Sequence, residues 1–199
     1  SESSVAGLKI LTGDSVPVAR VPNLIDLERV SDLCSAVAGQ QAISGAYILT
    51  MGRLLASKRI DAAILGFAEI APRCSHKLLI VGSGPDQQRL EEIARRCQVA
   101  DRVAFLGWVS NPLPLLAKAD ALMHLSTIEG FPNAILEAMI LKVPVVSGDW
   151  GDDARRLAES RALLVVDSDN AFAVGQATLQ ALFDSKIRTT LIENASIEA

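Results

Sequence analysis

The feature that most constrains this sequence is a regular exchange, from Tyr47 onward, between short β-rich runs and longer stretches with helical spacing. The runs predicted as strands are Tyr47–Met51, Lys77–Val81, Arg102–Leu106, Ala121–Leu125, Val143–Val146 and Ala162–Val166. The stretches predicted as helices are Ile60–Ala71, Asp86–Cys97, Pro112–Ala117, Pro132–Leu141 and Ala171–Phe183. Several strands are apolar without alternation, as expected where helices cover both faces of a sheet. Because strand–helix–strand crossovers are right-handed, this order predicts an α/β fold on a doubly wound parallel sheet.

The first 45 residues are less regular, and they decide where the domain begins. Leu8–Leu11 is compatible with a short strand, and Asp26–Val37 has helical spacing. A length of 199 residues fits one large domain that can bury a core without disulfides. We expect residues 1–20 to form an N-terminal lead-in, of the kind that joins two domains, and residues 21–199 to form the folded domain.

Charge and hydropathy exclude several classes of partner. The net charge of −4 argues against nucleic acid or an anionic membrane as the main partner. The apolar runs, such as Ala162–Val166, are far shorter than the roughly 20 residues that a membrane-spanning helix needs. The first residues lack the basic start and long apolar stretch of a signal peptide. We expect a cytoplasmic protein without a membrane span.

In a doubly wound sheet, ligands bind beyond the carboxyl ends of the strands. The most specific segment at such an end is Glu129–Glu137, which follows the strand Ala121–Leu125 and opens the helix Pro132–Leu141. The free amides around Asn133 at the helix start would favour an anion or sugar hydroxyls. Asn133 and Glu137 are four residues apart and share one helix face. A buried carboxylate needs partners, so Glu137 would bind a cis-diol such as a ribose or, alternatively, tie down the amides of a neighbouring loop.

Two further loops carry charge or glycine. After the first regular strand, Gly52 permits a turn, and Arg53 and Lys58 could both point at the strand ends. The planar guanidinium of Arg53 and the ammonium of Lys58 together suit a diphosphate. They would stabilise the negative charge that develops on the diphosphate when it departs as a leaving group. Two ordinary solvated cations at a helix start are the alternative interpretation. Gly82-Ser83-Gly84 precedes another helix and would allow close backbone approach to a nucleotide, although a plain turn explains it equally well.

The second glycine loop is not a dinucleotide fingerprint. Gln87 occupies the place of the third glycine, and the next strand ends at Leu106-Gly107-Trp108 with no acid to hold an adenosine ribose. An NAD-dependent enzyme is therefore the least favoured class. Trp108 could lie against a base or sugar, with half-buried packing as its simpler role.

Two acidic pairs look like metal ligands but have simpler interpretations. Asp167-Ser168-Asp169 lies just before the helix Ala171–Phe183, where Ser and Asp commonly cap. Asp152 and Asp153 are expected to form a cap or a solvated turn. We predict no metal site and no cofactor.

The histidines and cysteines receive no chemical role. His76 and His124 lie in or beside apolar strands without a nucleophile nearby in sequence. Three widely spaced cysteines, Cys34, Cys74 and Cys97, do not suggest a disulfide framework. We expect them to be small core hydrophobes in a reducing compartment.

Taken together and in order, these segments resemble the C-terminal domain of GT-B glycosyltransferases of family 4, over about Val21 to Val166. The matching blocks are Val21-Pro-Asn-Leu-Ile-Asp26, Gly52-Arg53-Leu54 with Lys58, Ile80-Val81-Gly82-Ser83-Gly84-Pro85, Val103-Ala104-Phe105-Leu106-Gly107, Glu129–Met139 and Val143-Pro144-Val145-Val146. The resemblance implies a Rossmann-like domain that is one half of a GT-B architecture. It also implies a retaining, metal-independent hexosyltransferase.

The resemblance assigns roles to these residues. Arg53 and Lys58, in the loop opened by Gly52, would hold the donor diphosphate, and the Gly107-Trp108 segment would border the base. The donor sugar would be held by Glu129 and the amides at Gly130, Phe131 and Asn133, and the ribose by Glu137. Gly82 and Gly84 belong to a further family block and are predicted to contact the nucleotide.

This chain departs from the family pattern at three places. Arg59 and Lys142 replace usual glycines, so the helix before Lys142 must end without the easy left-handed cap. The segment Gly151–Arg156 lacks a glutamate that is often present after that strand.

The resemblance implies a further, N-terminal domain that binds the acceptor, and no segment here matches it. We predict that this chain binds the donor but transfers no sugar alone. The predicted donor is a UDP-sugar in preference to a GDP-sugar, and the acceptor a glycan or lipid-linked glycan of polysaccharide biosynthesis. The full-length enzyme would be cytoplasmic, with the inner membrane surface as an alternative location. A sugar-nucleotide epimerase of the same fold and a non-catalytic nucleotide-binding module are the other interpretations.

Overall fold

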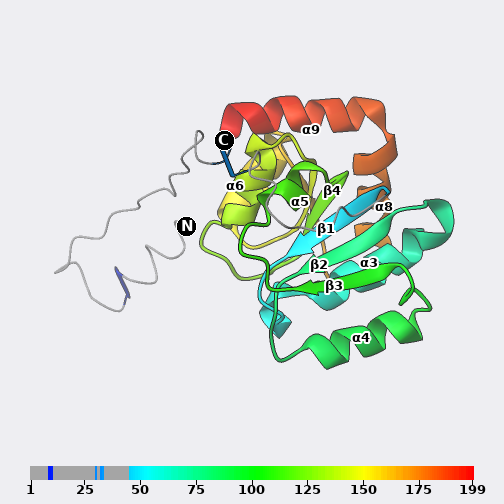
Figure 1. Ribbon diagram of the computed structural model, residues 1–199. Helices are drawn as coiled ribbons and strands as arrows, with labels where there is room; N and C mark the ends of the chain where they lie inside the picture. The colour runs from blue at the N-terminus through cyan, green and yellow to red at the C-terminus, as the bar shows by residue number, and fades with distance from the viewer. Residues whose placement is uncertain (1–8, 11–29, 31, 34–44) are drawn as a thin grey trace.

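The computed structural model describes residues 9–10, 30, 32–33 and 45–199. Within these residues lies one sheet whose order is β3-β2-β1-β4-β5-β6, with every neighbouring pair parallel (Figure 1). The strands are β1 (Tyr47–Met51), β2 (Lys77–Val81), β3 (Val103–Gly107), β4 (Ala121–His124), β5 (Val145–Gly148) and β6 (Leu164–Val166). The predicted doubly wound, Rossmann-like α/β fold is confirmed.

Helices cover both faces of the sheet. One face packs against α3 (Ile60–Ile70), α4 (Gln87–Arg96) and α8 (Ala171–Phe183). The other packs against α5 (Leu113–Ala117), α6 (Asn133–Ile140) and α7 (Asp152–Glu159). The last helix, α9 (Ser185–Glu198), lies along one end of the sheet and places Leu191 in the first core and Ala195 in the second.

Alternate residues of the central strands build the two cores. Ile48 and Leu78 lie in the core beneath α3 and α8, whereas Leu49 and Leu79 lie in the core beneath α5 and α6. All four are at most 1% exposed. Covering both faces explains the unbroken apolar runs of these strands.

Two helices were missed, and each buries only two apolar residues. In α7 the buried residues are Asp153, Ala154 and Leu157, so the predicted cap or solvated turn at Asp152-Asp153 is wrong and both residues lie in the first helical turn. In α9 only Leu191 and Ala195 are buried. Few apolar positions on an otherwise polar segment give little sequence signal for a helix.

The expectations for the N-terminal region are only partly covered. Of Leu8–Leu11, Lys9 and Ile10 are described and are helical, so the suggested strand is wrong there. Residues 30, 32 and 33 of the helix expected over Asp26–Val37 are helical. The rest of that helix, and the domain boundary expected at residues 20–21, lie outside the described residues.

The end of α6 corrects the expectation for Lys142. The residue adopts the left-handed conformation with φ 59° although it is not glycine. The amide of Val143 donates to the Ala138 carbonyl at 2.9 Å, and the amide of Lys142 donates to the Met139 carbonyl at 3.1 Å. This is the paired pattern of a Schellman cap. The helix therefore keeps the left-handed cap at some conformational cost.

Replacing Lys142 with glycine tests that cost. Lys142→Gly is expected to stabilise the chain by about 0.5–1 kcal/mol, because relief of left-handed strain exceeds the added freedom of the unfolded chain. Lys142→Ala, which still carries a Cβ, is the control and should stay within about 0.5 kcal/mol of wild type. Urea unfolding measures both, and equal stability of the glycine and alanine variants would contradict the strain.

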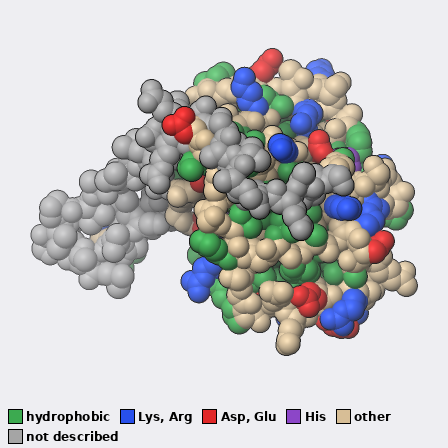
Figure 2. Space-filling view, viewed as in Figure 1, with side chains coloured by type: hydrophobic (Ala, Val, Ile, Leu, Met, Phe, Trp, Pro, Cys, Tyr) green, Lys and Arg blue, Asp and Glu red, His purple; other side chains and the backbone are tan. Residues whose placement is uncertain are grey.

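The surface of the described part shows no single-sign field in the view of Figure 2, where basic and acidic side chains are interspersed. Among the described residues no helix combines the length and apolarity that crossing a membrane requires.

Candidate functional site

The strand order reverses between β1 and β4, which is where an open α/β sheet forms its ligand crevice. A cavity of about 420 Å³ lies at this point, at the carboxyl ends of the strands. Eight residues predicted from sequence line it: Gly52, Arg53, Lys58, Gly82, Trp108, Glu129, Asn133 and Glu137. The structure therefore brings together residues that are up to 85 positions apart in the sequence, Gly52 and Glu137 being the extremes.

Three predicted residues, Gly84, Gly130 and Phe131, are not among the residues lining the cavity. Phe131 instead packs edge-on against Trp150, with ring centroids 5.4 Å apart. Trp150 is buried and its indole N–H donates to Ser147 Oγ at 3.0 Å. This pair anchors the Glu129–Pro132 segment to the β5 end of the sheet.

The loop that carries Arg53 and Lys58 is pinned to the loop after β2. The Gly52 amide donates to the Val81 carbonyl at 2.9 Å, and the Leu54 amide donates to the Ser83 carbonyl at 3.0 Å. Leu54 itself is fully buried. The loop is thus fixed by its backbone and by one apolar anchor, which leaves the side chains of Arg53 and Lys58 to line the cavity.

The glycines after β2 are needed for this loop-to-loop contact. A Cβ on Gly82 would lie 1.8 Å from the Gly52 carbonyl oxygen, and a Cβ on Gly84 would lie 2.3 Å from the Leu54 carbonyl oxygen. Sequence reasoning assigned their small size to close approach by a nucleotide. The close neighbour is the backbone that carries the cations, and Gly84 acts at a distance from the cavity.

Gly84→Ala should therefore disturb the cation loop. The added Cβ meets backbone atoms of Leu54 at 2.3–2.7 Å, and we expect a loss of about 1–3 kcal/mol in unfolding free energy. Gly130→Ala is the matched control, because nothing lies within 4 Å of its Cβ position. That control should change stability by less than about 0.5 kcal/mol. If urea unfolding shows no loss of unfolding free energy in Gly84→Ala, the steric argument is refuted.

Arg59 fixes the far end of the cation loop. It adopts φ 50°, so the usual glycine conformation is kept at this departure from the family pattern. Its guanidinium Nη2 donates to the Ser168 carbonyl at 3.1 Å and to Asp169 Oδ1 at 2.8 Å. The Ser168 hydroxyl in turn donates to the Leu125 carbonyl at 2.9 Å.

The predicted capping role of Asp167-Ser168-Asp169 is therefore wrong. The N-cap of α8 is Asn170, whose side chain accepts from the Ala173 amide. Ser168 and Asp169 instead connect the loop after β6 to the loops after β1 and β4. Among the described residues, no group of three His, Cys, Asp or Glu side chains is placed to hold a metal ion.

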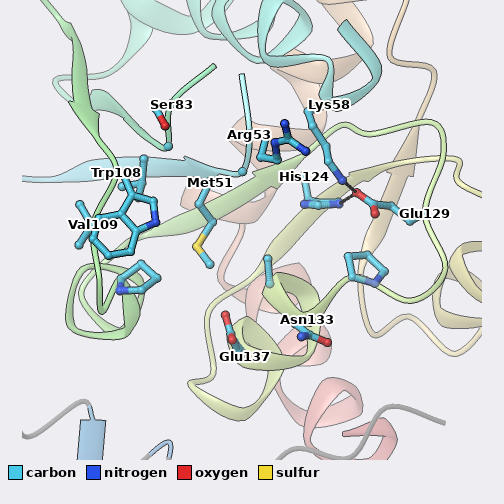
Figure 3. A pocket seen from close by; sticks show the side chains of 16 residues that line it. Met51, Arg53, Lys58, Ser83, Trp108, Val109, His124, Glu129, Asn133 and Glu137 are labelled. Carbon is cyan, nitrogen blue, oxygen red and sulfur yellow. Dashed lines mark hydrogen bonds and ion pairs between the residues drawn. The ribbon is translucent and has the colours of Figure 1, made fainter. Parts of the chain in front are cut away.

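Glu129 lies at one end of the cavity and is contacted by two nitrogens (Figure 3). Lys58 Nζ lies 2.6 Å from Glu129 Oε1, and His124 Nε2 lies 3.1 Å from the same oxygen. Burial alone would raise the pKa of Glu129, but the hydrogen bonds and positive charge of His124 and Lys58 outweigh it and lower this pKa from 4.5 to about 2. The carboxylate is ionised at neutral pH.

This lowered pKa makes stability depend on acid. Because the folded pKa lies below the unfolded value of 4.5, the Glu129 contribution is complete above pH 4.5 and is lost as the pH falls toward 2. Glu129→Gln removes it, so the stability gap between wild type and variant should shrink by on the order of 2 kcal/mol over that window. Urea unfolding at pH 6, 4.5, 3.5 and 3 measures the gap. If the difference in unfolding free energy between wild type and Glu129→Gln does not change with pH, the contacts of Glu129 with Lys58 and His124 do not lower its pKa.

Glu137 occupies a different environment on α6. Its carboxyl lines the cavity, and burial raises its pKa above the ordinary value. None of the described residues donates a hydrogen bond to the Glu137 carboxylate, so the alternative in which this side chain ties down loop amides is not what the described structure shows. A partly buried carboxylate to which no described residue donates is well placed to accept from a ligand hydroxyl.

Trp108 stands at the opposite end of the cavity from Glu129 (Figure 3). It is 74% exposed, so the predicted half-buried packing is wrong. Gly107 before it has φ 68°, which turns the chain at the end of β3. A large exposed aromatic ring on a cavity wall is available for stacking.

Sequence reasoning gave His124 no role, yet it lines the cavity and contacts Glu129. The signal that could have found it is position, because His124 is the last residue of β4 and faces the loop that follows. The other histidine, His76, lies at the amino end of the sheet with Nε2 3.5 Å from Asp120 Oδ2. Cys74 and Cys97 are unpaired and only partly buried, and they pack against the core beneath α3 and α8, whereas Cys34 lies outside the described residues.

Comparison with known proteins assigns the chain to a family. The sequence profile described as "Glycosyl transferases group 1" matches residues 45–184. The chain therefore belongs to this family, and the resemblance to the C-terminal domain of a GT-B glycosyltransferase is confirmed.

Individual relatives agree with that assignment. The N-acetylgalactosamine-N,N'-diacetylbacillosaminyl-diphospho-undecaprenol 4-alpha-N-acetylgalactosaminyltransferase of Campylobacter jejuni is 29% identical over 180 residues, covering 89% of this chain and 47% of the relative. A Mycobacterium tuberculosis GDP-mannose-dependent alpha-(1-6)-phosphatidylinositol monomannoside mannosyltransferase is 32% identical over 147 residues, covering 69% and 38%. The chain thus spans about half or less of the length of these relatives.

The fold is also found in solved structures. The crystal structure of Anabaena HepE in complex with UDP matches with a TM-score of 0.83 at 21% identity, covering 100% of this chain and 57% of that chain. At this identity the match supports the fold alone.

Proposed function

We propose that the cavity binds the nucleoside diphosphate of a sugar donor, and that the chain is the donor-binding half of a retaining glycosyltransferase of family 4. The enzyme would transfer a hexose from a UDP- or GDP-sugar to a glycan or lipid-linked acceptor in polysaccharide biosynthesis. The observation that carries the proposal is the lining of one cavity, at the switch point of the sheet, by two cations from the loop after β1 and two carboxylates, Glu129 from the loop after β4 and Glu137 from α6.

The order of these groups along the cavity fits the parts of a donor. In Figure 3, Glu129 lies at one end with Lys58 and Arg53 beside it, Glu137 lies across from the cations, and Trp108 lies at the other end. A sugar against Glu129, a diphosphate against the cations, a ribose against Glu137 and a base near Trp108 follow the same order.

In the transfer reaction, these residues would stabilise negative charge. Departure of the sugar leaves negative charge on the diphosphate, and Arg53 and Lys58 would neutralise it. The N-terminus of α6, where Pro132, Asn133 and Ala134 line the cavity, adds positive potential. With these groups we expect binding to need no metal.

A UDP-sugar is the favoured donor. The HepE structure with a similar fold contains UDP, whereas the mycobacterial relative is named as GDP-mannose-dependent. The relatives are also longer than this chain, so we expect residues 21–199 to supply the donor site and an N-terminal domain to supply the acceptor site. The full-length enzyme would act in the cytoplasm or at the inner membrane surface.

Calorimetric titration with UDP, GDP, ADP and NADH, in the presence of a chelator, tests the proposal. One nucleoside diphosphate should bind saturably with a binding free energy of about −4 to −6 kcal/mol, which corresponds to a dissociation constant between about 1 mM and some tens of micromolar. Lys58→Ala should weaken binding about 10- to 100-fold, because one charge-assisted hydrogen bond is lost.

Lys77→Ala is the control for that experiment. Lys77 begins β2 at the opposite end of the strands and is exposed, so removing its charge tests a general electrostatic effect. The Lys77→Ala variant should bind the nucleoside diphosphate with the affinity of wild type. Equal losses in the two variants, preference for NADH, or no binding in the stated range would overturn the assigned roles.

A further inference from the structure

Glu129 is held by two side chains of very different character. Lys58 has a flexible stem, three donors and a side chain that is 26% exposed, whereas His124 is a planar ring that is 8% exposed. Both reach the same atom, Glu129 Oε1, at 2.6 and 3.1 Å. Because a carboxylate can only accept, His124 Nε2 must carry the proton of this hydrogen bond.

We propose that His124 is a positioning residue that keeps the Glu129 carboxylate in place when a donor diphosphate draws Lys58 away. This inference rests on the proposed function, since it concerns what happens to Glu129 when the cation beside it turns to another anion. It gives His124, which lines the same cavity, a part in arranging the sugar end of the site.

The argument begins with the charges. A diphosphate carries more negative charge than one carboxylate, and an ammonium on a flexible stem can turn from one anion to the other. Glu129 would then lie near a like charge, in a place where burial already disfavours its ionised form. Without another donor, the carboxylate would turn away or take up a proton.

The position of His124 suits it to remain. It ends β4, where it pairs in register with Ser147 of β5, and its backbone is part of the sheet. Within the described part of the chain, two side chains are hydrogen-bonded to the Glu129 carboxylate, namely Lys58 and His124. If Lys58 turns away, His124 is the donor that stays. A short, buried ring on a strand in the sheet interior cannot turn toward the diphosphate as the long, partly exposed side chain of Lys58 can.

The test removes the two donors separately in the ligand-free chain, with the carboxyl carbon of Glu129 followed by NMR through an acid titration. Lys58→Met reproduces the state in which the lysine has left. In this variant, the midpoint of the Glu129 titration should stay below 4.5, the ordinary pKa of a glutamate. The double variant Lys58→Met/His124→Met should titrate above 4.5, at least about one pH unit higher than Lys58→Met.

Two further variants separate positioning from folding. Lys58→Met/His124→Gln keeps an N–H donor and should bring the midpoint back toward that of Lys58→Met. Lys58→Met/His76→Met removes a histidine that is similarly buried and also lies beside a carboxylate, and it should leave the Glu129 midpoint unchanged.

Equal midpoints in Lys58→Met and in the double variant with His124→Met would overturn the role of His124. A failure of His124→Gln to lower the midpoint would overturn it as well. Because no nucleotide is present, this result is independent of whether the chain binds a donor. Failure of UDP, GDP or ADP to bind would instead refute the proposed function.

Discussion

The site depends on how closely the loops after β1 and β2 approach one another. Gly82 and Gly84 leave no room for a Cβ beside the carbonyls of Gly52 and Leu54, and the two loops are joined by backbone hydrogen bonds. The cations of the first loop are therefore carried by a segment with little freedom to move. Pre-organised charge of this kind stabilises an anion without further ordering cost.

Hydrogen bonds also join the loops on the two sides of the switch point between β1 and β4. The Ser126 hydroxyl donates to the Ser57 carbonyl at 3.0 Å, which ties the loop after β4 to the segment that carries Lys58. Arg59 ties that segment to the loop after β6. Glu129 and Lys58 thus face each other because their loops are connected on both sides.

Much of this could be predicted from the sequence, since the central strands and the helices between them follow apolar patterns that both cores require. The helices α7 and α9 could not, because each buries only a few apolar residues on a polar segment. The cavity residues were found where a loop carries charge or an unusual motif. His124 was missed because an apolar strand pattern conceals that its last residue faces a ligand crevice. The packing of Gly84 against the backbone of Leu54 could not be predicted, because the sequence indicates a close approach but not which backbone approaches.

The most direct test of the central claim, that this cavity is a nucleoside diphosphate site, is a crystal structure of the chain with UDP bound. The diphosphate should lie between Arg53 and Lys58, with the ribose hydroxyls at the Glu137 carboxylate and the base toward Trp108. UDP bound elsewhere, or in this cavity with its ribose away from Glu137, would contradict the claim.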